Sequence, residues 1–313
     1  MGTGRVGIVW NPSKTEKDVL EAGLRDAVGD GDAPEVSWFE TSADDPGIAA
    51  TKSALDAGAD LVVAAGGDGT VRAVAEHLAD SRADADLGII PLGTGNLLAR
   101  NLEIPLADVA AAFTRALTAA ASPLDIGWAE VTTASGVERH AFAVMAGFGI
   151  DAHMITETDD ALKDKAGWLA YVESLGRAVS ASAVIDVRLA IDDSAPRPER
   201  AHTVIVGNCG TLQGGMTLLP DADPRDGELD LLVLHADGVA GWLDTLRTAA
   251  WENGIKRLFG SGRAESSDST THGRLRSVQV DLDEPRAFEV DGDELGEITR
   301  VKMWVQPAAV RVR

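Results

Sequence analysis

The chain has 313 residues, which is enough for about two domains of ordinary size. Its residues are 45% hydrophobic and 25% charged, a composition that is typical of globular proteins and excludes a disordered, collagen-like or coiled-coil chain. The formal net charge of −22 repels the phosphates of nucleic acid, so we expect no nucleic-acid partner.

Two further features indicate a compartment. The sequence has no apolar run of about 18 residues and no signal-peptide pattern at its start. The single cysteine, Cys209, cannot form an intramolecular disulfide, which fits a reducing environment, and we interpret it as a core residue. We therefore expect a cytoplasmic protein.

Up to about residue 125, apolar runs at residues 6–10, 61–65 and 87–90 alternate with helical patterns, which is typical of parallel βαβ units. From residue 127 on, strand patterns dominate, at residues 128–132, 140–145, 184–191, 203–206, 229–234, 278–282, 287–290, 301–305 and 309–312. Helical patterns at residues 162–182 and 239–258 interrupt them, and residues 260–273 are typical of a loop. We expect an α/β domain over residues 1–126 and a mainly antiparallel β-sandwich domain over residues 127–299.

The strongest local signal is the run Gly66-Gly67-Asp68-Gly69-Thr70, between an apolar strand and an amphipathic helix that begins near Val71. Glycines let the backbone approach phosphate oxygens, and the helix N-terminus offers N–H groups and a partial positive charge. An aspartate there would repel phosphates directly, so we interpret Asp68 as a ligand of a divalent cation that bridges them. The alternative is a tight turn in which Asp68 only caps the helix.

Two more loops follow strands of the same predicted sheet. They are Asn11-Pro12-Ser13-Lys14-Thr15 and Pro91-Leu92-Gly93-Thr94-Gly95-Asn96. Because ligands of parallel sheets bind beyond the carboxyl ends of the strands, we expect all three loops to face one nucleotide site. The sequence lacks G-x-x-x-x-G-K-[ST], so this site is not a P-loop.

In this order, Asn11-Pro12 and the runs at residues 66–70 and 91–96 resemble the diacylglycerol kinase catalytic-domain family of bacterial lipid kinases, relatives of the sphingosine and ceramide kinases. The resemblance continues through residues 142–151, 206–208, 214–215, 220–222 and 226–230, and it ends at Asp291-Gly292. It thus covers nearly the whole chain, and the ordered set is far more specific than any single motif.

The resemblance implies an α/β plus β fold. A Rossmann-like, nucleotide-binding N-terminal domain would lie beside a β-rich lipid-substrate domain, strands at about residues 300–313 would return to the first domain, and ATP would bind in the cleft. The ATP contacts that it implies are Asn11, Pro12, Ser13, Lys14, Thr15, Thr41, Gly66, Gly67, Asp68, Gly69, Thr70, Val71, Arg72 and Thr94.

The resemblance also implies two Mg²⁺ ions and a base. A catalytic Mg²⁺ would be linked to Asp68. A structural Mg²⁺ would be held by Asp226 with main-chain carbonyls at Asp223 and Glu228. A carboxylate just after Asp291-Gly292 would accept the proton of the acceptor hydroxyl.

The chain departs from the family pattern at three places. Lys14-Thr15 stands where the opening motif has Ser-Gly, and Leu97 stands where the second loop has aspartate. The family's late Asp-Gly-Glu reads here as Asp291-Gly292-Asp293-Glu294. Since neighbours on a strand point to opposite faces, at most one of the two should reach the acceptor, and we assign the base to Asp293.

These observations predict a lipid kinase of phospholipid biosynthesis that uses ATP and Mg²⁺ to convert diacylglycerol to phosphatidic acid. It would contact the inner membrane surface transiently, and a homodimer is left open. NAD kinase shares the Gly-Gly-Asp-Gly-Thr run, but Leu97-Leu98-Ala99-Arg100 does not match its second motif. Another lipid acceptor, such as a sphingoid base or ceramide, and an inactive nucleotide or lipid sensor are the alternatives.

Overall fold

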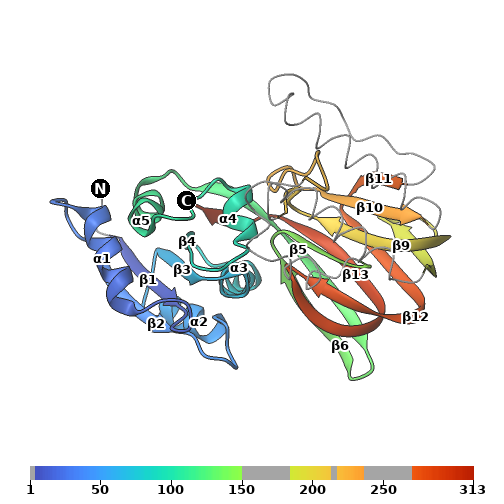
Figure 1. Ribbon diagram of the computed structural model, residues 1–313, viewed down its shortest axis with the longest axis horizontal. Helices are drawn as coiled ribbons and strands as arrows, with labels where there is room; N and C mark the ends of the chain where they lie inside the picture. Colours follow the sequence, from blue (N-terminus) through green and yellow to red (C-terminus); the bar gives the residue numbers. More distant parts are fainter. Residues whose placement is uncertain (1–3, 150–183, 213–216, 236–269) are drawn as a thin grey trace, which may run out of the picture.

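The computed structural model describes residues 4–149, 184–212, 217–235 and 270–313. Figure 1 shows an elongated arrangement, with a helix-bearing α/β part at one end and a β-rich part at the other. The helices are α1 (Lys17–Val28), α2 (Ile48–Asp56), α3 (Asp68–Ser81), α4 (Leu97–Asn101) and α5 (Val109–Thr118). The predicted helices at residues 162–182 and 239–258 lie outside the described residues.

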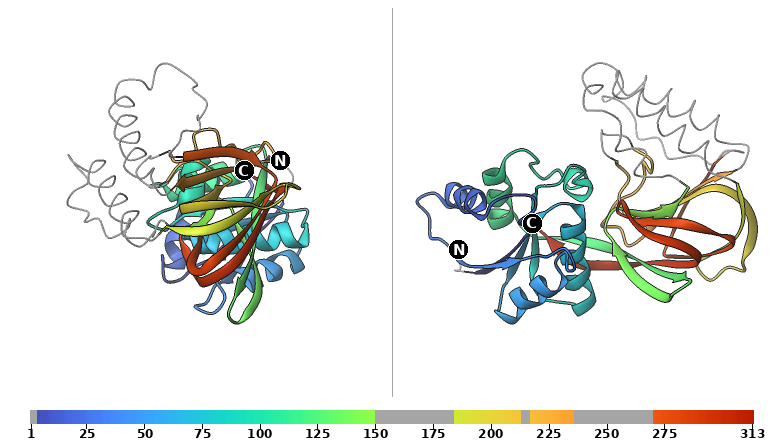
Figure 2. Two further views of the ribbon diagram at one scale, coloured as in Figure 1. Left: turned by 90° about the vertical axis from the view of Figure 1, so that its right-hand side faces the viewer. Right: turned by 60° about the horizontal axis from the view of Figure 1, so that its bottom comes forward.

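In the α/β part, four neighbouring strands run parallel in the order β4-β3-β1-β2. They are β1 (Arg5–Trp10), β2 (Glu35–Glu40), β3 (Leu61–Gly66) and β4 (Asp86–Pro91). β3 and β4 are buried throughout, as expected of apolar runs covered on both faces. Helix α1 packs against α5 and α2 against α3, and Figure 2 shows these pairs on opposite faces of the sheet.

Strand β2 and helix α2 are elements that the sequence analysis did not predict. β2 lies at the edge of the parallel sheet, and its residues alternate between exposed and half-buried. An edge strand with this mixed burial lacks the continuous apolar run that marked its neighbours.

The β-rich part consists mainly of antiparallel pairs. Its strands are β5 (Ser122–Thr133), β6 (Gly136–Phe142), β7 (Met145–Phe148), β8 (Ile185–Ile191), β9 (Arg197–Gly207), β10 (Leu229–His235), β11 (Thr270–Leu275), β12 (Ser277–Val290) and β13 (Asp293–Val312). A cluster of buried apolar side chains, including Phe142 and Phe288, fills the space between them.

Strand β13 connects the two parts of the molecule. Most of its length pairs with β5 and β12, but Arg311 and Val312 at its end pair in parallel with β4. Arg311 also donates a hydrogen bond to the buried carboxylate of Asp86 at 2.7 Å. The polypeptide therefore ends in the α/β part, beside the strand that precedes one of the glycine loops (Figure 2).

Several predicted strand limits were wrong. The run 140–145 is divided between β6 and β7, because the N–H groups of Ala143 and Val144 donate to Asp291 instead of pairing in a ladder. The runs 278–282 and 287–290 form one strand with a register shift, as do 301–305 and 309–312. The predicted loop at residues 260–273 extends too far, since β11 begins at residue 270.

Two expectations concern burial. Cys209 is buried, as expected of a core residue, and this burial raises the pKa of its thiol. Among the residues that the model describes, no helix is both long enough and apolar enough to cross a membrane.

Candidate active site

The model brings together the three loops that follow β1, β3 and β4. A Cβ placed on Gly93 would lie 2.8 Å from the Cα of Gly67, and one placed on Gly67 would lie 3.8 Å from the Cε of Lys14. Only glycine allows the second and third loops to approach this closely. The carboxyl ends of three parallel strands thus form one corner, as the sequence predicts.

The first loop is held by its own asparagine. Asn11 Oδ1 accepts hydrogen bonds from the N–H of Ser13 at 2.9 Å and from its hydroxyl at 2.7 Å. Pro12 lies inside this turn, and the carbonyl of Asn11 accepts the N–H of Lys14. The turn fixes the backbone as far as Lys14, whose side chain extends towards the second loop.

Other predicted nucleotide contacts contribute backbone or packing. Thr41, directly after β2, is buried, and its N–H donates to the carbonyl of Trp10. Thr70 and Val71 are also buried in the first turn of α3, whereas Thr94 lies exposed in the third loop. Helix α3 presents its first N–H groups at this corner, which favours an anion there.

Asp68 is the first residue of α3, and it links the second loop to the third. Its Oδ2 accepts the N–H of Asn96 at 2.8 Å, and its Oδ1 accepts the N–H of Leu97 at 2.6 Å. The side chain is half-buried and caps α4, so Asp68 has a structural role beside the metal-binding role that the sequence indicates. Burial raises the pKa of Asp68, and the nearby charge of Asp293 raises it further, against the opposing effect of the two N–H donors.

Helix α3 carries a polar stripe, Arg72, Glu76 and Asp80, at intervals of four residues, which places all three on one face. This face meets the β-rich part. Arg72 Nη2 lies 2.5 Å from Asp293 Oδ2, although 221 residues separate them in sequence. A Cβ on Gly69 would lie 3.5 Å from the same Asp293 oxygen, so the predicted base does lie beside the second loop.

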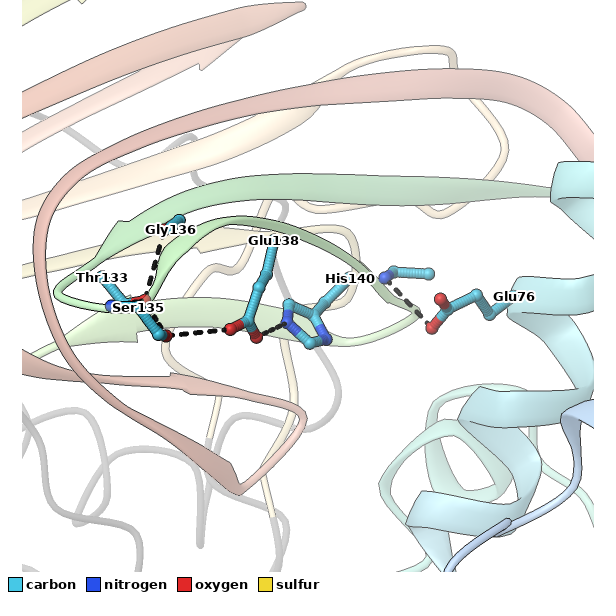
Figure 3. A network of polar contacts seen from close by, with 7 residues as sticks. Glu76, Thr133, Ser135, Gly136, Glu138 and His140 are labelled. Carbon is cyan, nitrogen blue, oxygen red and sulfur yellow. Dashed lines mark hydrogen bonds and ion pairs between the residues drawn. The ribbon is translucent and has the colours of Figure 1, made fainter.

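The rest of the stripe contacts β6. Glu76 Oε2 accepts the N–H of Ala141 at 3.3 Å, and Asp80 pairs with Arg139. Figure 3 shows Glu76 reaching from α3 towards β6, where Glu138 and His140 pair with each other. The sequence analysis missed the stripe, although its spacing was visible as a polar helical face.

Asp291 and Gly292 form a two-residue turn between Val290 and Asp293. Their φ angles are +50° and +88°, as a type I′ hairpin turn requires. The Asp291 carboxylate is buried, and burial raises its pKa to about 6. It accepts hydrogen bonds from three consecutive N–H groups, those of Ala143, Val144 and Met145, at 2.8–2.9 Å. The turn that carries Asp293 is therefore anchored to the β6–β7 connection.

An apolar cavity of about 80 Å³ lies next to these carboxylates. One of its walls is Leu97, whose N–H binds Asp68, and another is Gly292, which precedes Asp293. The other described lining residues are Met145, Ala146, Gly147, Phe148, Ile205, Leu212, Leu218 and Glu289. The cavity is thus lined by sequence neighbours of Asp293 and by a residue that binds Asp68, and it offers an apolar surface to a ligand.

The acidic turn after residue 220 is bound to β5, because the N–H of Gly227 donates to Asp125 Oδ2 at 2.7 Å. Asp226 Oδ2 pairs with Arg274, which also lies 3.4 Å from Glu228. The carbonyl of Asp223 accepts the N–H of Arg225 and that of Asp226. Arg274 thus supplies the positive charge that we assigned to a structural metal, and the residues as placed do not fit Mg²⁺ unless Arg274 moves. The structural Mg²⁺ stays a prediction.

The described residues contain no cluster of three or more metal-ligating side chains. At Asp68 this is no obstacle, because Mg²⁺ in phosphoryl-transfer sites is commonly bound by one or two carboxylates together with substrate phosphates and water. A single carboxylate beside a helix N-terminus fits that pattern, although its oxygens already accept two N–H groups.

Comparisons with known proteins agree with this geometry. The diacylglycerol kinase catalytic domain matches residues 6–129, and the YegS C-terminal NAD kinase beta sandwich-like domain matches residues 144–313. A protein of Pseudomonas aeruginosa (strain UCBPP-PA14) named "Probable lipid kinase YegS-like" is 32% identical over 262 residues, which are 83% of this chain and 78% of that protein. The diacylglycerol kinase of Staphylococcus saprophyticus subsp. saprophyticus is 27% identical over 94% of this chain and 90% of its own.

A solved structure extends the likeness to the fold. The crystal structure of a diacylglycerol kinase from Bacillus anthracis str. Sterne matches with a TM-score of 0.69 at 20% sequence identity, and it covers 100% of this chain and 97% of that chain.

Proposed function

The chain belongs to the family of diacylglycerol kinases and YegS-like lipid kinases, and on this premise we propose that it transfers the γ-phosphate of ATP to the free hydroxyl of diacylglycerol. The products are phosphatidic acid and ADP. The reaction takes place at the membrane surface, which the protein contacts transiently from the cytoplasmic side.

The observation that carries this proposal is the position of the apolar cavity. It lies between Leu97, whose N–H holds Asp68, and Gly292, which precedes Asp293. An acceptor with an apolar body and one reactive hydroxyl suits this position, because the part of the body next to the hydroxyl can lie against the apolar walls while the hydroxyl faces the carboxylates. A soluble polar acceptor would gain nothing from such walls.

The three glycine-bearing loops suit the nucleotide. In this proposal, the backbone at residues 11–15, 66–72 and 94 cradles the phosphates, and Thr41 closes the site at the end of β2. Lys14, whose Cε lies near Gly67, contributes a positive charge where the family pattern has serine. Bound Mg²⁺, held by Asp68, would neutralise the charge that develops on the transferred phosphoryl group.

The chemistry then needs little beyond position. The acceptor oxygen forms a bond to the γ-phosphorus as the bond to the β,γ-bridging oxygen breaks, and ADP leaves with that electron pair. Asp293 accepts the hydroxyl proton, and its side chain is 52% exposed, so an acceptor can reach it. The N–H groups of α3 stabilise the transferring group.

One observation favours a second candidate, a sensor that binds nucleotide or lipid without turnover. One oxygen of the proposed base, Asp293 Oδ2, accepts a hydrogen bond from Arg72, so this oxygen is not free to meet an acceptor hydroxyl while the contact lasts. Intact Asp68 and the adjoining cavity favour the kinase, and the two candidates differ in whether a labelled product forms.

The test is an assay with γ-labelled ATP, Mg²⁺ and mixed micelles that contain diacylglycerol, monoacylglycerol, sphingosine or ceramide. We expect label in phosphatidic acid and none with NAD as acceptor. Label in a sphingoid product would keep the kinase and replace its substrate. ATP binding without any labelled lipid would support the sensor and overturn the proposed activity.

A further inference from the structure

We propose that Arg72 exchanges partners during the reaction: it holds Asp293 in the absence of nucleotide and moves to the phosphates when ATP binds, which releases Asp293 to act as the base. This inference rests on the proposed function, which it deepens by giving Arg72 two successive partners. It makes ATP binding and activation of the base one event.

The first support is the position of Arg72 between two acidic groups. Its Nη2 lies 2.5 Å from Asp293 Oδ2, and its charge also acts on Asp291, the pKa of which it lowers against the larger effect of burial. Arg72 lies on the second turn of α3, one turn after Asp68. The backbone of Arg72 is therefore one helical turn from the loop that would cradle the phosphates.

The second support is that the hydrogen bonds of Arg72 are incomplete. Its side chain is only 14% exposed, and within the described part of the chain its buried Nε–H has no hydrogen-bond partner. An unpaired buried donor is unfavourable, and an arriving phosphate oxygen would satisfy it. Guanidinium groups bind phosphates through two parallel N–H donors, which a single contact to one Asp293 oxygen does not use.

The third support is the difference in exposure within the pair. Asp293 is 52% exposed, so it loses little when Arg72 leaves, because water can solvate the released carboxylate. The phosphates carry several negative charges near the N-terminus of α3, so they compete strongly for the same cation. Exchange therefore runs towards the phosphates when ATP is present.

The exchange predicts that Asp293 and ATP compete for Arg72. Removal of Asp293 should tighten ATP binding, although it removes the base. A simple base with no tie to Arg72 would tighten binding only by removing a negative charge, and that effect would be the same whether or not Arg72 is present.

A double-mutant cycle on binding tests this. The Kd of a non-hydrolysable ATP analogue with Mg²⁺ is measured by calorimetry for the full-length protein and for Asp293→Ala, Arg72→Met and the double variant. Glu297→Ala, which removes an exposed carboxylate on the same strand, controls for the change in net charge. Arg72→Lys, which keeps the charge, supplies a second variant if Arg72→Met folds poorly.

We expect Asp293→Ala to lower the Kd by about fivefold, and Arg72→Met to raise it. In the Arg72→Met background, Asp293→Ala should change the Kd by less than about twofold, like Glu297→Ala in the unaltered protein. An unchanged or higher Kd in Asp293→Ala overturns the exchange. Equal tightening in both backgrounds also overturns it, because it would show simple repulsion.

These outcomes are separable from failure of the proposed function. Absence of binding to any form of the protein would overturn both the kinase and the exchange. Binding that lacks the predicted coupling would overturn the exchange alone and leave Arg72 as an ordinary contact.

Discussion

Three Asp-Gly pairs of this molecule lie in two contrasting regions. Asp68-Gly69 and Asp291-Gly292 lie where the α/β and β-rich parts meet, and both carboxylates accept backbone N–H groups. Asp226-Gly227 lies in a turn of the β-rich part, where the Asp226 carboxylate accepts the N–H of Glu228 at 3.0 Å and also pairs with the Arg274 side chain. Backbone donors stay in place when a ligand arrives, whereas an arginine can move away. The same dipeptide thus builds a rigid corner in one region, whereas in the other its carboxylate also has a side-chain partner that can leave.

The largest effect that would test this contrast is expected at Asp68. Asp68→Asn should lower turnover by about 10²–10³-fold, because it removes a charge that would hold the metal, as loss of one electrostatic stabiliser commonly does. The variant should also lose about 1–3 kcal/mol of folding stability, since the amide nitrogen would face the N–H of Asn96 or Leu97. Lipid phosphorylation and urea unfolding measure the two effects.

Asp80→Asn is the matched control, because Asp80 lies on the same helix but is bound by an exposed arginine. Its turnover and stability should change little. If Asp68→Asn were as stable as the unaltered protein, the two N–H contacts would be energetically unimportant, and the contrast between the regions would lose its basis.

The next prediction uses pH at Asp291. Burial raises the pKa of this carboxyl from 3.8 to about 6, so the folded state binds the proton more tightly than the unfolded state. Its stabilising contribution is therefore complete below the unfolded pKa and is lost as the pH rises through about 6. The loss is about 3 kcal/mol in all, of which about 1 kcal/mol falls between pH 5 and pH 7.

Asp291→Asn provides the reference, because its side chain does not titrate. The stability advantage of the unaltered protein over this variant should shrink from pH 5 to pH 7 when both are unfolded in urea. These values avoid the sequence pI of about 4.5, where solubility is lowest. An advantage that grows with pH would mean that the three N–H donors outweigh burial and lower the pKa.

The contrast also explains which parts of the site could be predicted from sequence. The glycine corner was predictable, because β1, β3 and β4 are apolar strands of one parallel sheet. In such a sheet the carboxyl ends of neighbouring strands lie together. Residue type and order were sufficient. The assignment of Asp293 to the site came from a family resemblance, and the model places it beside Gly69.

The partners of these carboxylates could not be predicted in the same way. Arg72 contacts Asp293 because β12 and β13 bring a segment that lies 221 residues later in the sequence next to α3. No local sequence pattern indicates such a contact. The Asp291 contacts required a break between β6 and β7, which the apolar run at residues 140–145 conceals. Arg274 lies in β11, a strand that we did not predict, so its pairing with Asp226 was also hidden.

A smaller effect is expected at the turn that carries Asp226. Mg²⁺ and Arg274 would compete for Asp226, so Arg274→Gln should increase the rise in melting temperature that Mg²⁺ causes, through stronger binding to the native state. Asp226→Ala should abolish this part of the rise, whereas Asp68→Ala should leave it intact. Thermal scans with and without Mg²⁺ decide the question. An equal Mg²⁺ response in Arg274→Gln, Asp226→Ala and the unaltered protein would show that the turn binds no metal.

The smallest effect is expected near the C-terminal end of α3, away from the glycine loops. Asp80 and Arg139 form an ion pair whose side chains are 53% and 49% exposed, so water screens their attraction. A double-mutant cycle with Asp80→Ala and Arg139→Ala should give a coupling energy of about 0.2–1 kcal/mol in urea unfolding, and it should fall further in high salt. Arg139 also lies over the ring of Trp128, 4.5 Å from its centroid, so Arg139→Ala alone should cost more than Asp80→Ala alone. A coupling energy well above about 1 kcal/mol would mean that Asp80 belongs to the rigid corner. Exposure of the side chains would then not explain which contacts are strong.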